Sequence, residues 1–346
     1  MPYATLVDIA RRVNKSVATV SRVINGKDNE GIRISSKTRE RILSLAKELN
    51  YHPNYLARHL VKKDSRVIGL LVPDIMQVFF NEITYHLSRA LDERGYDLLL
   101  AHSYEQPEPE RKAIQMILSR RVNGIIVAPA MGQENLELLE GIRIPLVLLD
   151  RYFSGKEFHT VSSDDVSGSR QLVEHLIDQG ARRILFICGN TKTSVSMERL
   201  QGYRRAFRER GLPLDEQLIV ESGYFQVDGY TVTRRMLSEN RLEHVQAIMG
   251  VNDEVALGAM EALWEHDLRV PEDLLVAGYG DERYSKYLRV PLTSVRQPTD
   301  ALARETCSML MELIEREQST ARTVKVPCNL VIRRSTVRSP VQEGSR

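Results

Sequence analysis

The chain has 346 residues, of which 42% are apolar and 27% charged, and its formal net charge is +2. This length and apolar content suffice for about two or three buried cores, which excludes a disordered or fibrous chain. No apolar run approaches the roughly 18 residues that a membrane span needs. The three cysteines lie far apart, so we expect neither a disulfide framework nor a cysteine-based zinc site. The N-terminal residues lack a signal-peptide pattern, which predicts a protein of the reducing cytoplasm.

The small net charge hides an uneven distribution along the chain. Residues 1–63 hold 13 basic and 5 acidic residues, whereas the remaining residues hold 35 basic and 41 acidic ones. A small basic segment joined to a mildly acidic body is typical of a module that binds a polyanion, attached to a second module. A basic surface that only meets solvent is the alternative at this point.

Three amphipathic helices are predicted in the basic segment. Apolar residues recur at helical spacing over residues 5–13, and Ser16 is a good N-cap for a second helix after a short turn. Ser35 caps a third helix, whose apolar stripe runs from Ile42 to Leu49. Two short helices joined by a tight turn describe a helix-turn-helix.

The outer face of the second helix is small and polar, as a helix that enters a DNA major groove requires. Arg22 can reach guanine acceptors there, and Val17 and Ala18 can touch a thymine methyl group. Basic residues nearby suit phosphate contacts, which fix the register without reading sequence. They are Arg11, Arg12, Lys15, Arg33, Lys37 and Arg39.

From Arg66 onward, strand-length apolar runs alternate with helical stretches, beginning with VIGLLV, DLLLAHS, GIIVAPA and IPLVLLD. Such runs predict parallel strands that are buried on both faces, in a doubly wound α/β arrangement. The pattern restarts near residues 150–164, and about eleven strands are too many for one compact sheet. We therefore expect two α/β lobes, with a ligand between them at the carboxyl ends of the strands.

Several residue patterns resemble the lactose-repressor (LacI/GalR) family of transcription regulators. In the basic segment they include Asp8-Ile9-Ala10, the run from Ser16 to Asn25, and Leu49-Asn50-Tyr51. In the body they include Arg199-x-x-Gly202-Tyr203, Asn252-Asp253 and Val331-Ile332-Arg333. The resemblance covers nearly the whole chain. Two features depart from the family, namely the turn Asn14-Lys15 and a longer loop over residues 26–34.

The resemblance implies an α/β fold with two doubly wound parallel-sheet lobes, like those of periplasmic binding proteins, preceded by a small all-α helix-turn-helix domain. It implies a DNA-binding domain over residues 1–52, a hinge helix and linker over 53–65, and an effector-binding and dimerisation domain over 66–346. In the last, the N-lobe is expected at about 66–163 plus 293–323, and the C-lobe at about 164–292 plus 324–336.

The function implied by the resemblance is sequence-specific DNA binding by a transcriptional regulator, expected to be a repressor. We expect a homodimer on a pseudo-palindromic operator at the nucleoid of a bacterial cytoplasm, with no membrane, cofactor, metal or catalytic role. The implied DNA contacts are Thr5, Ser16, Val17, Ala18, Thr19, Ser21, Arg22, Asn25, Arg33, Tyr51, Asn54, Ala57 and Leu60. Leu60 is the expected minor-groove wedge. Packing of Leu56 and Leu60 on the body is the alternative.

The resemblance also implies a small effector, expected to be a sugar or sugar derivative, between the lobes. Its implied contacts are Phe79, Phe80, Asp150, Arg199, Phe225, Asn252 and Asp281. Aromatic rings that stack on a sugar, with polar groups for adjacent hydroxyls, suit a polyol. Residues 193–196 offer no guanidinium to hold a purine. Core packing of Phe79 and Phe80, and a structural clamp at Arg199, are the alternatives.

One position departs from the family within this set. Many relatives have an acid where this chain has Gly280, so either Asp281 takes its place or the ligand differs.

Two other classes of function stay open. An enzyme with a phosphate loop at residues 189–194 is disfavoured, because the GxxxxGK[ST] spacing is absent. A solute-binding protein of a sugar uptake system would fit the body alone, but it would need a signal peptide and no basic segment.

Overall fold

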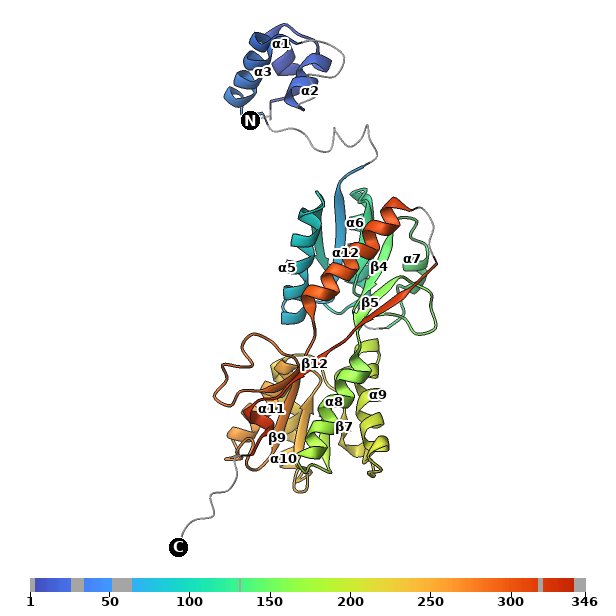
Figure 1. Cartoon of the computed structure of the whole chain (residues 1–346), viewed down its shortest axis with the longest axis vertical. Helices are drawn as coiled ribbons and strands as arrows, with labels where there is room; N and C mark the ends of the chain where they lie inside the picture. Colours follow the sequence, from blue (N-terminus) through green and yellow to red (C-terminus); the bar gives the residue numbers. More distant parts are fainter. Residues whose placement is uncertain (1–3, 26–33, 52–63, 131, 317–319, 339–346) are drawn as a thin grey trace. The chain divides into compact units, whose positions relative to one another are not determined.

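The computed structural model describes residues 4–25, 34–51, 64–130, 132–316 and 320–338. The chain divides into two compact units, residues 1–65 and 66–346 (Figure 1). Among the helices of the described residues, none is both long and apolar enough to cross a membrane.

The first unit is a bundle of the helices α1 (Leu6–Val13), α2 (Val17–Ile24) and α3 (Ser36–Glu48). Each begins at a hydroxyl side chain that accepts the N–H three residues on, which satisfies a donor that the helix leaves unpaired. The caps predicted at Ser16 and Ser35 are thereby confirmed. The buried face of the three helices forms one apolar core, made of Ile9, Ala10, Val13, Val20, Val23 and Ile42. Residues 53–63 of the hinge helix and linker expected over residues 53–65 lie outside the described residues.

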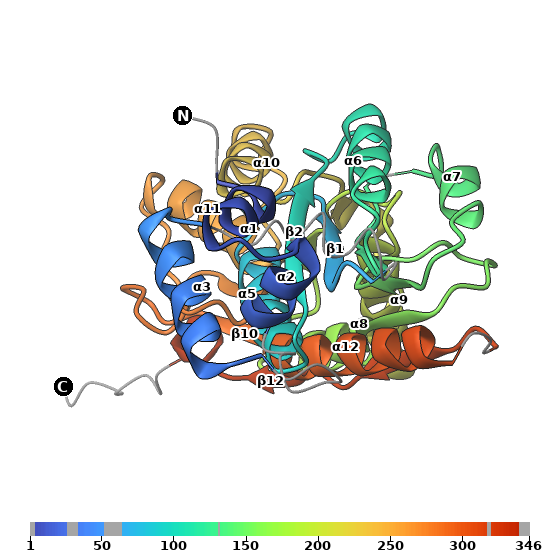
Figure 2. The same ribbon diagram turned by 90° about the horizontal axis from the view of Figure 1, so that it is seen from above.

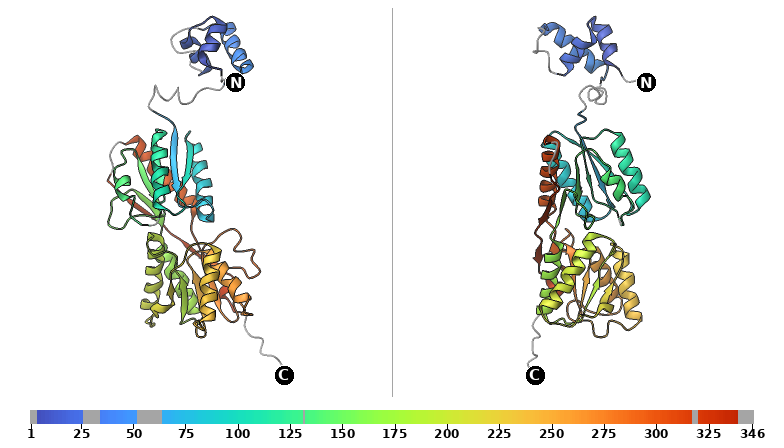
Figure 3. Two further views of the ribbon diagram at one scale, coloured as in Figure 1. Left: turned by 180° about the vertical axis from the view of Figure 1, so that it is seen from behind. Right: turned by 90° about the vertical axis from the view of Figure 1, so that its right-hand side faces the viewer.

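The second unit contains two six-stranded sheets, each covered by helices on both faces (Figure 3). The first sheet has the order β11-β5-β4-β3-β1-β2, and every pairing in it is parallel. Its strands are β1 (Val67–Val72), β2 (Asp97–His102), β3 (Gly124–Val127), β4 (Leu146–Leu149), β5 (Thr160–Ser163) and β11 (Thr323–Val326). Their apolar side chains fill both faces, which is why the runs read as continuous.

The helices of this first lobe cover opposite faces of its sheet (Figure 2). On one face α5 (Val78–Asp92) and α12 (Thr299–Glu315) pack together over one apolar core. On the other face α6 (Pro107–Ser119) and α7 (Leu136–Glu140) cover a second core. The lobe therefore has the doubly wound arrangement that the alternating pattern predicts.

The second lobe repeats this plan with the order β12-β10-β9-β8-β6-β7, in which only β12 is antiparallel to its neighbour. Its strands are β6 (Ile184–Ile187), β7 (Ile219–Val220), β8 (Ala247–Gly250), β9 (Leu275–Gly280), β10 (Thr293–Arg296) and β12 (Asn329–Val331). Its helices are α8 (Asp165–Asp178), α9 (Ser194–Glu209), α10 (Gln226–Ser238) and α11 (Asp253–Trp264), with short 3-10 turns at Glu216–Leu218 and Arg334–Thr336. The predicted fold class is confirmed.

The strand pairing corrects the expected lobe boundaries. Residues 293–296, expected in the N-lobe, form β10 and pair with β9 in the second sheet. Residues 324–326, expected in the C-lobe, belong to β11 and pair with β5 in the first sheet. Both strands are short, and nothing in their residues distinguishes one parallel sheet from the other. The chain thus crosses between the lobes after β5, after β10 and after β11.

Candidate DNA-reading helix and interlobe cavity

The helix α2 exposes the face that the sequence predicts for base reading. Val20 and Val23 are buried, whereas Val17, Ala18 and Arg22 are exposed. Within the described part of the chain, no hydrogen bond or ion pair engages the Arg22 guanidinium. This long cation therefore stands beside small side chains that allow a backbone to approach a surface closely, as a groove-reading helix requires.

Four polar residues that the sequence predicts as DNA contacts make hydrogen bonds near the two ends of α2. At the N-terminus the hydroxyls of Ser16 and Thr19 lie 2.8 Å apart, and Ser16 also caps the helix. At the C-terminus the Asn25 amide donates to the Ser21 hydroxyl at 3.1 Å. These bonds fix the side chains without burying them fully, so each keeps hydrogen-bonding capacity for an external partner.

The remaining predicted DNA contacts lie away from this face. Thr5 is the N-cap of α1, and its hydroxyl donates to the Asp8 carboxylate at 2.6 Å. Tyr51 is partly buried and packs against the core of the first unit. Arg33, Asn54, Ala57 and Leu60 lie outside the described residues.

The second unit encloses a small cavity between its two lobes, of about 40 Å³. Its walls come from segments that follow strands β4, β8, β9 and β10, and from the N-termini of α5 and α9. The carboxyl ends of parallel strands meet at one edge of each sheet, so the two lobes face each other with these ends. The lining residues are Gln77, Phe79, Phe80, Asp150, Arg151, Val195, Arg199, Tyr224, Asn252, Tyr279, Gly280, Glu282 and Gln297.

Five of the seven predicted effector residues therefore come together, namely Phe79, Phe80, Asp150, Arg199 and Asn252. The two phenyl rings lie edge to face with centroids 5.1 Å apart, and Phe80 is also part of the first-lobe core. Phe80 is therefore both a core residue of the first lobe, which was the alternative from the sequence, and part of the cavity wall.

The other two predicted effector residues do not line the cavity. The Asp281 carboxylate is held between Arg296, whose Nε donates to Oδ2 at 2.6 Å, and Arg333, whose Nη2 lies 2.5 Å from Oδ1. Phe225 is the half-exposed N-cap residue of α10, and its neighbour Tyr224 occupies the wall instead. Phe225 and Asp281 each lie one position along the chain from a lining residue, because neighbouring residues after a strand point in different directions.

Arg151 is the main lining residue that the sequence reading missed. Its guanidinium donates to both oxygens of Glu105, at 2.7 and 2.8 Å, and lies over the rings of Phe80 and Tyr224. Burial acts to lower the pKa of Arg151, but the Glu105 charge outweighs it and raises that pKa. The Arg151 Nε–H has no hydrogen-bond partner among the described residues. Its place directly after the predicted effector residue Asp150 was the signal available in the sequence.

Arg199 crosses from α9 to the start of α8 as a buried ion pair. Its Nε and Nη2 both lie 3.3 Å from Asp165 Oδ1, and Nη1 donates to the Val251 carbonyl at 2.7 Å. The guanidinium carbon lies 3.8 Å from the centroid of the Tyr279 ring. All three nitrogens thus serve the protein itself, which favours the structural clamp that the sequence left open as an alternative.

Asn252 is likewise committed to the fold. Its Oδ1 accepts the Val255 N–H at 2.9 Å as the N-cap of α11, and its Nδ2 donates to the Tyr224 carbonyl at 2.7 Å. It therefore shapes the wall by holding Tyr224 in place.

Two buried carboxyl groups in the wall have no cation of their own. Asp150 meets only the Gln297 amide, at 3.5 Å, and burial, together with the Asp165 charge, raises its pKa to about 7. Burial, with the Asp253 charge, raises the pKa of Glu282 to about 8. The Glu282 Oε2 has no hydrogen-bond partner in the described residues.

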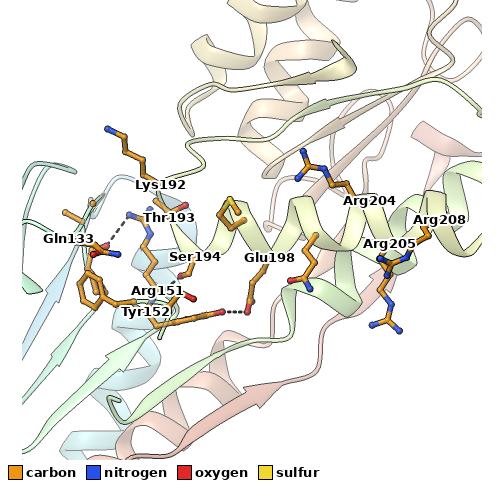
Figure 4. A pocket seen from close by; sticks show the side chains of 17 residues that line it. Gln133, Arg151, Tyr152, Lys192, Thr193, Ser194, Glu198, Arg204, Arg205 and Arg208 are labelled. Carbon is orange, nitrogen blue, oxygen red and sulfur yellow. Dashed lines mark hydrogen bonds between the residues drawn. The ribbon is translucent and has the colours of Figure 1, made fainter. Parts of the chain in front are cut away.

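A larger groove of about 610 Å³ lies beside the cavity, along α9. Figure 4 shows Arg204 and Arg208 on that helix and Lys192 in the turn before it, with Tyr152 reaching across the groove to bond Glu198 on α9. None of the seven predicted effector residues lines this groove. Arg204 pairs with Glu216, and Arg205 with Glu209, so part of its positive charge is already balanced.

Several of the polar contacts that join the lobes involve partly exposed side chains. The Tyr152 hydroxyl donates to Glu198 at 2.5 Å, and Lys325 reaches the same carboxylate. On the other side of the junction Arg283 pairs with Glu82 at 2.8 Å, with the arginine side chain 79% exposed. Exposed pairs contribute little, so they do not hold the lobes in one arrangement.

Comparison with known proteins gives matches to both units. Residues 5–54 match the bacterial regulatory proteins of the lacI family, and residues 173–336 match a periplasmic binding protein-like domain. Catabolite control protein A of Priestia megaterium is 30% identical over 334 residues, which are 96% of this chain and 99% of that protein.

Two solved structures extend these matches. A lac repressor dimer bound to operator and the anti-inducer ONPF has a TM-score of 0.85 and 27% identity, over 97% of this chain and 100% of that one. A complex of the transcriptional regulator CelR with cellobiose has a TM-score of 0.74 and 29% identity, over 96% and 99%.

The first prediction concerns the buried pair of Arg199 and Asp165. Arg199→Ala leaves the Asp165 carboxylate, 1% exposed, without a countercharge, so the free energy of unfolding should fall by about 3–5 kcal/mol. Urea denaturation monitored by circular dichroism measures it. The double variant Arg199→Ala/Asp165→Ala should lose less than the two single variants added together. Additive losses would mean that the pair is not coupled.

The second prediction uses the raised pKa of Glu282. Between its ordinary value of 4.5 and about 8, the folded state binds the proton more strongly than the unfolded state, so stability falls as pH rises through this window. Glu282→Gln removes that contribution, so the stability of the variant relative to wild type should rise from pH 5 to pH 8. Urea denaturation at several pH values measures this, with the exposed Glu243→Gln as control. If the stability difference between Glu282→Gln and wild type stayed constant from pH 5 to pH 8, this would contradict the raised pKa of Glu282.

Proposed function

The chain belongs to the lacI family of bacterial regulatory proteins and is a DNA-binding transcriptional regulator, and from this premise we propose a repressor whose effector is a sugar or sugar derivative. The observation that carries the proposal is the interlobe cavity, where the rings of Phe79 and Phe80 stand beside two carboxyl groups without cations. Rings of this kind stack on a sugar, and the carboxyl groups accept bonds from its hydroxyls. The CelR structure, whose complex contains cellobiose, supports the same chemistry.

We propose that the exposed face of α2 reads bases, with Arg22 as its guanine contact and Val17 and Ala18 beside it. Ser16, Thr19, Ser21 and Asn25 would contact the backbone or base edges near the two ends of the helix. The predicted roles of Thr5, Arg33, Tyr51, Asn54, Ala57 and Leu60 stay part of this proposal. The operator in the lac repressor structure supports duplex DNA as the partner.

The proposal includes a homodimer that acts in the bacterial cytoplasm at the nucleoid. The lac repressor structure contains a dimer. In this chain Met76, Tyr85 and Tyr287 are more than half exposed. Met76 and Tyr85 lie in one groove together with Arg283, which offers a mixed apolar and polar surface for a second copy. The relatives are regulators, so we propose no catalytic role and set aside a solute-binding protein of an uptake system, which would not need the first unit.

The cavity size supports a regulatory movement of the lobes. At about 40 Å³ it is far smaller than the roughly 300–1,000 Å³ of ordinary ligand pockets, so a sugar has to enter while the lobes are further apart. A ligand that prefers one lobe arrangement shifts the population toward it. In a dimer, this would change how well two DNA-binding units fit adjacent major grooves. A coupling of about 2–3 kcal/mol would change operator affinity by tens- to about a hundredfold.

The third prediction tests the reading helix. Arg22→Ala should weaken binding to the operator by about 1–3 kcal/mol and relax the preference at one base pair, because a guanine contact carries sequence information. Fluorescence anisotropy on the operator and on single-base variants measures both effects. The control Arg12→Ala, a phosphate contact by our proposal, should weaken binding equally on all sequences and flatten the salt dependence. If Arg22→Ala behaves like this control, then Arg22 does not read bases.

The fourth prediction tests the effector class. Isothermal titration of the full chain against mono- and disaccharides, nucleobases and amino acids should give binding by at least one sugar. That sugar should also change operator affinity in the anisotropy measurement, by the coupling argued above. Binding by nucleobases or amino acids alone would overturn the sugar effector.

A further inference from the structure

We propose that Glu282 contacts the effector from the cavity wall beside Gly280, and that the effector is an uncharged sugar rather than a phosphorylated or acidic one. This inference rests on the proposed function, because it names the class of sugar that the interlobe cavity selects. Three independent features carry it: the backbone at Gly280, the balance of charge in the wall, and the hydrogen-bonding capacity that the wall has left.

The backbone at Gly280 makes room for the Glu282 carboxyl. Gly280 has a φ of 120°, a conformation that residues with a side chain rarely adopt. A Cβ added there would lie 3.6 Å from Glu282 Cγ and 4.0 Å from Oε1. The Glu282 side chain thus occupies the space next to the position where a side chain at 280 would begin. Both residues line the cavity, whereas Asp281 between them does not.

Hydrogen bonds to the Asp253 carboxylate anchor the segment that carries Glu282. One oxygen of this buried carboxylate accepts the Glu282 N–H at 2.9 Å and the Ser285 hydroxyl at 2.5 Å. The other oxygen accepts the Ser294 hydroxyl at 2.5 Å. The backbone of Glu282 is therefore anchored to the body of the second lobe, which makes it a rigid support for a ligand contact.

The charges of the wall leave no cation for an anionic ligand. Arg151 is matched by Glu105 in a two-pronged pair, and Arg199 is matched by Asp165. The remaining lining groups that can carry charge are both acids, Asp150 and Glu282. If these two are protonated, the set is neutral, and if they are ionised, it is negative. A buried phosphate or carboxylate would meet repulsion or an uncompensated desolvation in either case.

The lining groups that still have hydrogen-bonding capacity also suit the hydroxyl groups of a sugar. The Tyr284 hydroxyl interacts with the Glu282 carboxyl but completes no hydrogen bond to Oε2, and Asp150 has only a long contact with Gln297. Arg151 Nε–H is one free donor. Sugar hydroxyls both donate and accept, so they can satisfy all three groups. A phosphate dianion or a carboxylate only accepts, so it cannot donate to these two acids when they are ionised.

The fifth prediction compares matched ligands on the full-length protein. The probes are glucose, galactose and cellobiose, each titrated beside an anionic counterpart: glucose 6-phosphate, galactose 6-phosphate and cellobionate. In isothermal titration, the sugar that binds should do so at least tenfold more tightly than its counterpart. Tighter binding of the anionic counterpart would overturn the inference while leaving the sugar effector intact. Binding of no sugar in this panel or in the wider one would overturn both.

Variants separate a ligand contact from a structural role. Glu282→Gln should weaken the neutral sugar at least tenfold and weaken its anionic counterpart less, so that the preference between them narrows. A purely structural role would weaken both equally, and that result would contradict the assignment. Glu243→Gln, the same change on the surface, should alter neither affinity. Should Glu282→Gln prove unfolded by circular dichroism, Glu282→Asp keeps the carboxyl and should keep the preference for the neutral sugar. Loss of this preference in Glu282→Asp would also contradict the role of Glu282 as a ligand contact.

Discussion

The junction between the two lobes depends on how buried charge is neutralised there. Two guanidinium groups lie at this junction, and each is paired inside its own lobe: Arg151 with Glu105 in the first, and Arg199 with Asp165 in the second. Breaking a buried pair costs several kcal/mol. Because neither pair spans the gap, the lobes can separate without exposing an unpaired charge. A buried pair across the gap, such as one between Arg151 and Asp165, would have locked the lobes together.

The bonds that do cross the gap are of a different kind. Tyr152, Lys325 and Glu198 form one cluster, and Arg283 with Glu82 forms a pair on the other side. Water can replace these partly exposed partners at low cost, so a modest binding free energy suffices to shift the lobe arrangement. The three crossings of the chain limit the movement to a change of angle, since each lobe is tied to the other at β5, β10 and β11.

The sequence predicted the local structure well, because local structure follows from patterns that neighbouring residues carry. The caps at Ser16 and Ser35 and the apolar strands are of this kind. It failed where a feature depends on distant residues. The lobe to which β10 belongs is decided by pairing with β9, and the burial of Asp281 is decided by Arg333. Arg151 was overlooked as a lining residue because its role follows from the position of Glu105, which is 46 residues away along the chain.

The same reasoning explains why one glycine alters the site. In a wall built from residues that follow strands, the chain turns after the last strand residue, and a side chain faces the cavity only if the local backbone allows it. With Gly280 at a positive φ, Asp281 adopts a left-handed conformation and turns to Arg296 and Arg333. The next acid, Glu282, then returns to the wall. The wall keeps a carboxyl at this point of the cavity because the residue that follows Asp281 is also an acid.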